Sequence, residues 1–345
     1  MGVSFITIGN LNIDNIIRHD GAFSLAQAGG NALYSAIGAH IWSWEVGIVS
    51  SIPHNYPLTW LDELRKAGID LSGVHRSELT VKLEEWFFYQ ADGSRIDHIY
   101  APRDCFPDLN IQNRRLSPNE IEALLVAIKK GSYEGLSFGE FRRLNPLTID
   151  LIPQKYYAIH GCHIAPNTYE SQLKIARHMK THNILTSLDL AKYPNGLEEA
   201  RLKSLLENVD VFLPSLVELN LIYPGVNPSH AIKRLSGTGL RAIVVKLGNK
   251  GSLIWDRERD ETRQMPIYPV RSNDLTGAGD AYCGGFLVGM FETGDPFQAA
   301  YYGTVSASMV IEKTDLLNAL RFNRYQAAIR LKALQAKAAQ TNIEV

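Results

Sequence analysis

Short apolar runs alternate with helical stretches along most of this chain, and this pattern constrains the fold more than any other feature. Strands that alternate with helices of such length build βαβ units around a parallel sheet. We expect strands at 3–9, 46–50, 156–160, 184–188, 209–213 and 242–247, and helices at 30–42, 57–67, 168–182 and 197–207. The predicted fold class is therefore α/β with a mainly parallel central sheet.

One region breaks the alternation and predicts a second, smaller sheet. Residues 81–89 and 95–100 are β-like runs on either side of the Asp92-Gly93 pair, which is typical of a hairpin turn. Residues 11–18 form another such run directly after the first strand. A small antiparallel sheet of these runs would cover the carboxyl edge of the parallel strands, where open α/β sheets bind ligands.

The rest of the chain suggests additions to one domain. Ser117 and Glu120 predict a capping box at the start of a helix that runs to about 130. Residues 132–153 have no clear pattern and indicate an insertion or a long mobile connection, whereas the residues from 315 onward are helical. A length of 345 residues admits two domains or one elaborated domain. We expect one domain over 1–345, with a β lid from about 11–19 and 72–104 and a C-terminal helical extension of about 315–345.

Composition excludes several classes of protein. The 35 Lys and Arg residues balance 36 Asp and Glu residues, so the basic footprint of a nucleic-acid binder is missing. Three widely separated cysteines disfavour a disulfide framework. The N-terminus is strand-like rather than typical of a signal peptide, and no apolar run reaches the roughly 18 residues of a membrane-spanning helix. These features predict a cytoplasmic protein that binds neither nucleic acid nor membrane.

The strongest chemical signal is the segment 274–280, Asp-Leu-Thr-Gly-Ala-Gly-Asp, at the start of a predicted helix. The small residues Gly277, Ala278 and Gly279 let backbone N–H groups at a helix N-terminus approach an anion. Asp280, in the first turn, can accept a proton from an attacking hydroxyl. Phosphoryl transfer requires this combination. The alternative is a glycine-rich helix start that carries an ordinary first-turn acid.

On these residues the sequence resembles the ribokinase-like (PfkB) family of carbohydrate and nucleoside kinases. The family signature Asp-Thr-x-Gly-Ala-Gly-Asp matches 274–280, with Leu275 at the usual Thr position. The resemblance implies a three-layer α/β/α ribokinase-like fold with a mainly parallel central sheet and a small β lid. It also implies that Asp280 is the catalytic base, that the 277–280 backbone is the anion hole, and that Asp274 and Thr276 belong to the nucleotide side of the site.

The resemblance extends to an acceptor site near the N-terminus. Residues 3–14 are similar to the family's first strand, whose final acid, Asp14, binds substrate hydroxyls; a carboxylate accepts from two hydroxyls at once. Gly30 and Asn31 are similar to the family's substrate loop, although Tyr34 stands where the family often has Asn. Without the resemblance, Asp14 is equally well interpreted as a turn or strand-end acid.

The resemblance further implies sites for ATP and Mg²⁺. Glu218 matches the acid of an Asn-x-x-Glu motif that organises magnesium, but Ser215-x-x-Glu218 is also a plain capping box. Gly248 and Gly251 match the turn that borders the nucleotide.

Two nucleotide-side positions differ from the family. Lys246 replaces a frequent Thr and is interpreted either as a phosphate ligand or as a solvated strand-end lysine. Gly303 takes the place of a common Asn on the predicted adenine-facing helix, 300–312. A monovalent cation near Asp274 and a homodimer through the lid are further hypotheses.

Together these residues predict an ATP-dependent phosphotransferase acting on a hydroxyl of a small sugar-like substrate. A nucleoside kinase of the same fold and a non-catalytic sugar- or nucleotide-binding protein are the alternatives; Asp280 favours an enzyme, because binding alone requires no base. Gly135-x-Ser137-x-Gly139 fits the nucleophile elbow of serine hydrolases, but it follows a predicted helix rather than a strand. His163 and Asp189 are weaker candidates for substrate contacts.

Overall fold

A nine-stranded sheet lies at the centre of the part of the chain that the computed structural model describes, residues 2–92, 94–106, 114–193, 196–271, 274–313 and 315–341. Its order is β13-β12-β11-β10-β9-β8-β1-β4-β5, parallel from β11 to β5 with β12 and β13 antiparallel at one edge. The strands are β1 (Phe5–Ile8), β4 (Val46–Ile52), β5 (Asp70–Arg76), β8 (Gly161–Ile164), β9 (Leu185–Leu188), β10 (Val211–Phe212), β11 (Ala242–Lys246), β12 (Ser252–Asp256) and β13 (Glu261–Met265). The mainly parallel sheet predicted from the alternation is confirmed.

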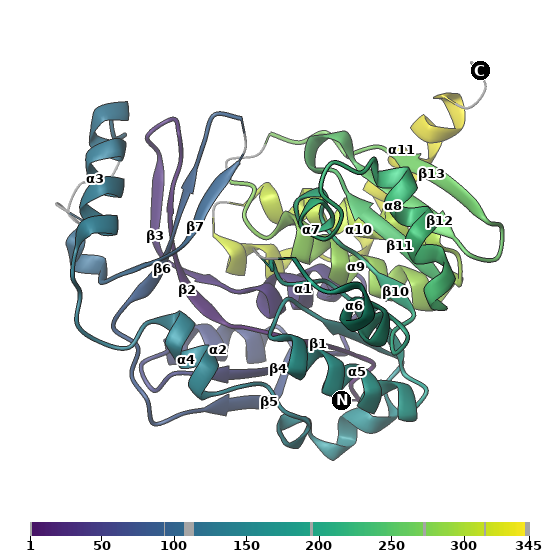
Figure 1. The fold of residues 1–345 in the computed structure, drawn as a ribbon, viewed down its shortest axis with the longest axis horizontal. Helices are drawn as coiled ribbons and strands as arrows, with labels where there is room; N and C mark the ends of the chain where they lie inside the picture. The colour runs from purple at the N-terminus through teal and green to yellow at the C-terminus, as the bar shows by residue number, and fades with distance from the viewer. Residues whose placement is uncertain are drawn as a thin grey trace.

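Helices cover both faces of this sheet, which gives three layers (Figure 1). Along β11, Ala242 and Val244 pack toward one helical layer and Ile243 and Val245 toward the other, so the strand reads as one continuous apolar run. The first layer contains α1 (Asn31–His40), α2 (Leu58–Lys66), α9 (Ala278–Thr293) and α10 (Pro296–Ile311). The second layer contains α5 (Tyr169–Thr181), α6 (Glu199–Leu206), α7 (Leu216–Ile222) and α8 (Pro228–Leu235).

A second sheet of four strands stands beside the first, on the left of Figure 1. Its order is β3-β2-β6-β7, with β2 (Asn12–Ile17), β3 (Phe23–Gly29), β6 (Glu84–Tyr89) and β7 (Arg95–Ala101). The expected small sheet is present, but it is not wholly antiparallel, because β2 and β6 pair parallel. The expected lid boundary at 72 was too early, since β5 pairs with β4 in the large sheet. Gly93, in the expected hairpin turn, lies outside the described residues.

Helix α3 (Pro118–Lys130) covers one face of the small sheet. Its Leu124 and Ile128 pack with Trp86 and Phe88 of β6, and the predicted Ser117–Glu120 capping box is present. Side chains alternate across a strand, so the residues between and beside these two face the other way. The opposite face of β6, which carries Glu85 and Phe87, therefore faces a cavity between the two sheets.

Three sequence expectations are corrected or refined by the structure. Residues 156–160 are not a strand, because the buried Tyr156 anchors a 3₁₀ turn by hydrogen bonding the Asp70 side chain, and the ladder begins at Gly161. The unassigned 132–153 stretch contains α4 (Phe138–Leu144), and the C-terminal part is a 3₁₀ turn followed by α11 (Arg324–Thr341). The 3₁₀ helices are η1 (Arg103–Cys105), η2 (Ile149–Leu151), η3 (Gln154–Ala158), η4 (Ser236–Thr238), η5 (Gly248–Lys250) and η6 (Leu316–Arg321).

No helix among the described residues is long and apolar enough to cross a membrane.

Candidate active site

The carboxyl ends of the parallel strands meet at a cavity of about 810 Å³, at the edge where open α/β sheets bind ligands. Its walls come from the ends of β9, β10 and β11, from the start of α9 and from the small sheet. Most of the residues that the sequence singled out line it: Asp14, Gly30, Asn31, Glu218, Lys246, Gly248, Thr276, Gly277, Ala278, Gly279 and Asp280.

Helix α9 begins with its N-terminus toward this cavity. Its N-cap, Gly277, has a φ of 73°, and a β-carbon there would lie 1.9 Å from the Tyr34 ring, so only glycine fits. Glycine also has no side-chain oxygen with which to cap the first-turn N–H groups of this 16-residue helix. These N–H groups and the positive end of the helix dipole therefore favour an anion in the cavity.

Asp280 lies in the first turn of α9 and lines the same cavity. Burial raises its pKa to about 6, while the Lys246 ammonium and the Arg95 guanidinium oppose that rise. A carboxyl group with such a pKa is ionised near neutral pH and is still basic enough to accept a proton. Its chemistry therefore suits a general base beside an anion site.

Lys246, at the end of β11, is a largely buried, ion-paired residue. Its ammonium donates to Asp189, which follows β9, and lies 3.5 Å from the Cys283 sulfur. The side chain of Lys246 is only 11% exposed, so the solvated-lysine interpretation is wrong. Asp189 also lines the cavity.

Glu218 takes part in a helix capping box and also lines the cavity. It completes the predicted capping box, because its carboxylate accepts from the Ser215 backbone N–H and its own N–H donates to the Ser215 hydroxyl. It also lines the cavity. No cluster of three His, Cys, Asp or Glu side chains that could hold a metal occurs among the described residues. A magnesium ion at this site would be held chiefly by phosphates and water, with Glu218 as the carboxylate that would help to hold it.

Asp14 lies at the other end of the cavity, on β2. Its Oδ1 atom is buried without a hydrogen-bond partner, and a β-carbon on Gly29 would lie 1.8 Å from its Oδ2 atom. Burial and the nearby Glu85 raise its pKa well above the usual range, against the pull of Arg95 and Arg142. The Oδ1 atom of Asp14 therefore has its hydrogen-bonding capacity available for a hydroxyl of a ligand.

Gly30 and Asn31 form the turn between β3 and α1. Gly30 has a φ of 104°, and a β-carbon there would meet the Asn10 carbonyl at 2.3 Å. The Asn31 side chain accepts from the Asn10 N–H at 2.7 Å and donates to the Pro166 carbonyl at 2.8 Å. Asn31 thus ties the β1 and β8 loops together at the cavity wall.

The small sheet supplies a charged wall that the sequence analysis missed. Glu85 accepts from Asn12 at 3.1 Å and from Arg142 at 3.2 Å, and Arg142 also donates to the Tyr100 hydroxyl at 2.7 Å. Asp97 of β7 pairs with Arg95 and with Lys192. The sequence signal for this wall is the pair of acids Glu84 and Glu85 directly before the aromatic run 86–89. No sequence signal marks Arg142, on α4.

Asp274 and Thr276 connect the small sheet to the anion loop. Asp274 accepts from the Thr276 N–H and hydroxyl, at 2.8 and 2.6 Å, and Thr276 contacts the Tyr89 hydroxyl of β6 at 2.7 Å. The Arg18 guanidinium lies 3.9 Å from Asp274, and Lys313 lines the adjoining hollow of only about 20 Å³. Arg18 does not line this hollow, and the hypothesis of a monovalent cation near Asp274 stays a prediction.

Several candidates lie away from the cavity. Gly251 has a φ of 84° in the turn before β12, and Gly303 packs against Tyr282 between α9 and α10. His163 is fully buried in β8, with Nδ1 against Ser187. Ser137 caps α4 through Glu140, so it is not on a nucleophile elbow and the hydrolase alternative is not supported.

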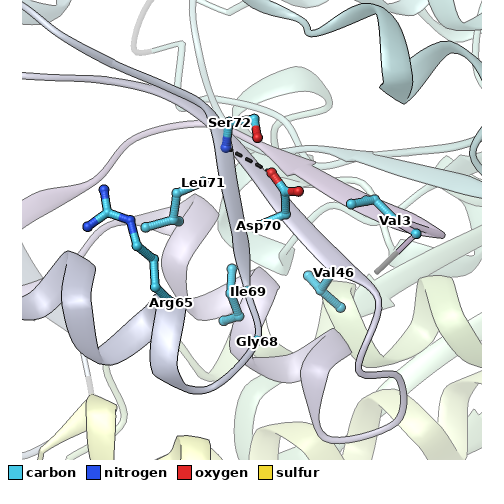
Figure 2. Close-up of a pocket in the computed structure, with 9 residues that line it drawn as sticks. Val3, Val46, Arg65, Gly68, Ile69, Asp70, Leu71 and Ser72 are labelled. Atoms are coloured by element: carbon cyan, nitrogen blue, oxygen red, sulfur yellow. Dashed lines mark hydrogen bonds between the residues drawn. The ribbon is translucent and has the colours of Figure 1, made fainter.

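A second hollow, of about 480 Å³, lies at the amino ends of β4 and β5 (Figure 2). Its acid, Asp70, already accepts from the Ser72 N–H, the Lys155 ammonium and the Tyr156 hydroxyl. The hollow is on the opposite edge of the sheet from the strand ends that bind ligands in open α/β folds. The carboxylate in this hollow therefore already makes its hydrogen bonds within the protein.

Comparisons with known proteins identify relatives of this chain. A family model described as pfkB family carbohydrate kinase matches residues 150–321. A cytidine kinase from Thermococcus kodakarensis is 27% identical over 299 residues, which cover 86% of this chain and 91% of that protein. A 5-dehydro-2-deoxygluconokinase from Clostridium tetani is 23% identical over 294 residues, covering 82% and 78% of the two chains.

Solved structures show the same fold. The ribokinase of Arabidopsis thaliana, solved with ribose and ATP, aligns with a TM-score of 0.67 at 17% identity, over 96% of this chain and 99% of that one. The nucleoside kinase of Methanocaldococcus jannaschii aligns with a TM-score of 0.63 at 19% identity, over the same shares of the two chains. The chain is therefore a sugar or nucleoside kinase with the ribokinase fold, and its residues 150–321 match the pfkB family of carbohydrate kinases.

Proposed function

We propose that this kinase transfers the γ-phosphoryl group of ATP to a hydroxyl of a small polyhydroxylated acceptor. The observation that carries the proposal is Asp280 in the first turn of a glycine-capped helix whose N-terminus lines the cavity. In this reaction Asp280 takes the proton of the acceptor hydroxyl, and the 277–280 backbone N–H groups stabilise charge on the moving phosphoryl group.

The acceptor occupies the opposite end of the cavity in this proposal. Asp14 accepts from its hydroxyls, and Gly30 and Asn31 form the floor on which it lies. Binding of this kind orients one hydroxyl toward Asp280 and converts the reaction into an effectively unimolecular step.

ATP approaches the anion loop from the β11 side, where Lys246 and Gly248 line the cavity. Gly251 shapes that turn, Gly303 packs against Tyr282 of α9, and Asp274 with Thr276 holds the loop in place. A magnesium ion, when bound with the nucleotide, offsets charge on the phosphates, and Glu218 is the residue that would help to hold it.

The acceptor is a sugar or a nucleoside. Similarity to the cytidine kinase over 86% of the chain favours a nucleoside. The cavity also extends past Asp14 to the charged wall of Glu85, Arg142 and Tyr100, where a group larger than a sugar ring has polar partners.

The small sheet acts as a lid in this proposal. Closure would exclude water, whose attack would otherwise waste ATP. Because α3 covers one face of this sheet, a homodimer through the lid would have to use its edge strands, β3 and β7.

The test is an ADP-release screen of purified protein over sugars, sugar acids and nucleosides, with the Asp280→Asn variant as the blank. We expect acceptor-dependent ADP release by the unmutated chain for one chemical class, with a phosphorylated acceptor detected by mass spectrometry. Absence of both turnover and calorimetric ATP binding would overturn the proposal.

A further inference from the structure

A largely buried lysine, Lys246, borders the proposed anion loop at 277–280. The Lys246 side chain leaves β11, crosses the end of β10 and meets Asp189 beyond β9. Its Nζ atom is 3.6 Å from the position that a β-carbon on Gly279 would occupy. The cation therefore borders the backbone that we assign to the transferred phosphoryl group.

The donor count of Lys246 leaves one hydrogen for a ligand. An ammonium has three N–H donors and no acceptor. One donor is used by the Asp189 carboxylate, and a second is directed at the Cys283 sulfur at 3.5 Å. The third has no partner among the printed contacts of the described side chains, and Lys246 lines the cavity.

The charges around Lys246 also favour a role beyond packing. Burial disfavours its charge, but Asp189, Glu218 and Asp280 surround it and raise its pKa well above the usual range. The remaining charged groups near Asp280 include Arg95 of β7, which belongs to the small sheet. These three acids follow β9, follow β10 and begin α9, so the charges that pair with Lys246 do not belong to the small sheet. Buried ion pairs are seldom retained for stability alone, since apolar replacements are often as stable.

We propose that Lys246 is a catalytic residue that contacts an oxygen of the phosphoryl group during transfer, and that Asp189 is the positioning residue that holds it there. The inference rests on the proposed function. The bond from phosphorus to the ADP oxygen breaks, the bond to the acceptor oxygen forms, and the acceptor proton passes to Asp280. Lys246 keeps its proton throughout and stabilises the negative charge on the phosphoryl oxygens.

The test compares Lys246→Met with the double variant Asp189→Asn/Lys246→Met. The single variant leaves Asp189 buried without its cation, so it will lose both stability and activity. The double variant removes both charges and is expected to recover the melting temperature. If Lys246 contacts the phosphoryl group, kcat of the double variant stays about 100- to 1,000-fold below that of the unmutated chain. Recovery of kcat to within a few-fold would overturn the inference, because Lys246 would then be only a counter-ion for Asp189.

A second readout requires no knowledge of the acceptor. ADP with aluminium fluoride imitates the phosphoryl group in transfer, and its affinity is measured by calorimetry beside that of ADP alone. We expect both variants to bind ADP normally and to bind the aluminium fluoride complex at least roughly tenfold more weakly. Equal affinities would overturn the inference even if no acceptor is found, whereas failure of the acceptor screen alone bears on the proposed function.

Lys155→Met is the matched control, because Lys155 also pairs with an aspartate, Asp70, but at the second hollow. It is expected to leave kcat and the affinity for the aluminium fluoride complex unchanged. Lys246→Met should also move the acid limb of the kcat/KM profile to higher pH, since the Lys246 charge lowers the pKa of Asp280.

Discussion

The two ends of the cavity are built in different ways. At the phosphoryl end, one short segment supplies the N-cap glycine, the first-turn N–H groups and Asp280, all on helix α9. At the acceptor end, Asp14 on β2, Glu85 on β6 and Arg142 on α4 line the cavity together, and Arg142 donates to Glu85. The first end is encoded locally by backbone conformation. The second end exists only when the small sheet and α4 come together, so it is the end that can vary between substrates.

The largest expected effect is at the phosphoryl end. Asp280→Asn removes the proposed general base while keeping its size, and should lower kcat by about a thousandfold with little change in the KM for the acceptor. Steady-state kinetics of ADP release measures both. A loss of less than tenfold would mean that another group takes the proton.

The corresponding change at the acceptor end should act on binding. Asp14→Asn leaves one oxygen instead of a carboxylate to accept hydroxyl hydrogen bonds, so the KM for the acceptor should rise roughly 10- to 100-fold. Asp20→Asn is the control, because Asp20 pairs with Arg115 at the surface of the same small sheet. A fall in kcat at unchanged KM would place Asp14 in the chemical step and remove the contrast between the two ends.

The pH dependence tests the phosphoryl end without a mutation. Asp280 must be ionised to accept a proton, and burial raises its pKa to about 6. The value of kcat/KM should therefore be level above that pH and fall about tenfold for each unit below it. The profile is measured with buffers of constant ionic strength. An acid limb near pH 4 would contradict the assignment of Asp280 as base.

A smaller effect is expected at the contact between Tyr89 of the small sheet and Thr276, which joins the two ends of the cavity. Tyr89→Phe removes the hydroxyl that contacts Thr276, a hydrogen bond of about 1 kcal/mol, and should raise the KM for the acceptor by about fivefold or less. Tyr169→Phe, which removes a remote hydrogen bond to the Arg201 carbonyl, is the control. An equal change in both variants would show that the effect is not specific to the lid.

The smallest expected effects distinguish the capping role of a serine from its place beside the cavity. Ser137 and Ser215 are both N-caps in capping boxes, and alanine at either should cost about 1 kcal/mol of stability. Only Ser215→Ala should also reduce kcat by a few-fold, because its partner Glu218 lines the cavity. Thermal melts and steady-state kinetics check this pair. Equal activity of the two variants would leave Glu218 with a structural role alone.

The sequence by itself determined the parallel sheet, because strands buried on both faces must be mainly apolar, as β1 is apart from Thr7 and β11 is up to Val245. It also located the glycine N-cap and the first-turn acid of α9, because both lie within a segment of four residues. Local patterns of this kind need no knowledge of distant contacts. The same reasoning failed at 156–160, where a buried tyrosine bonded to Asp70 turned an apolar run into a 3₁₀ turn.

The tertiary structure alone decided which chemically similar residues share the cavity. Ser137 and Ser215 have the same local motif, yet only the partner of Ser215 lies there. Lys246 and Asp189 are 57 positions apart, and their pairing depends on the order of β9, β10 and β11. A side chain's burial and charge environment depend on which strands are neighbours, and neighbours in a sheet are set by the packing of the whole chain.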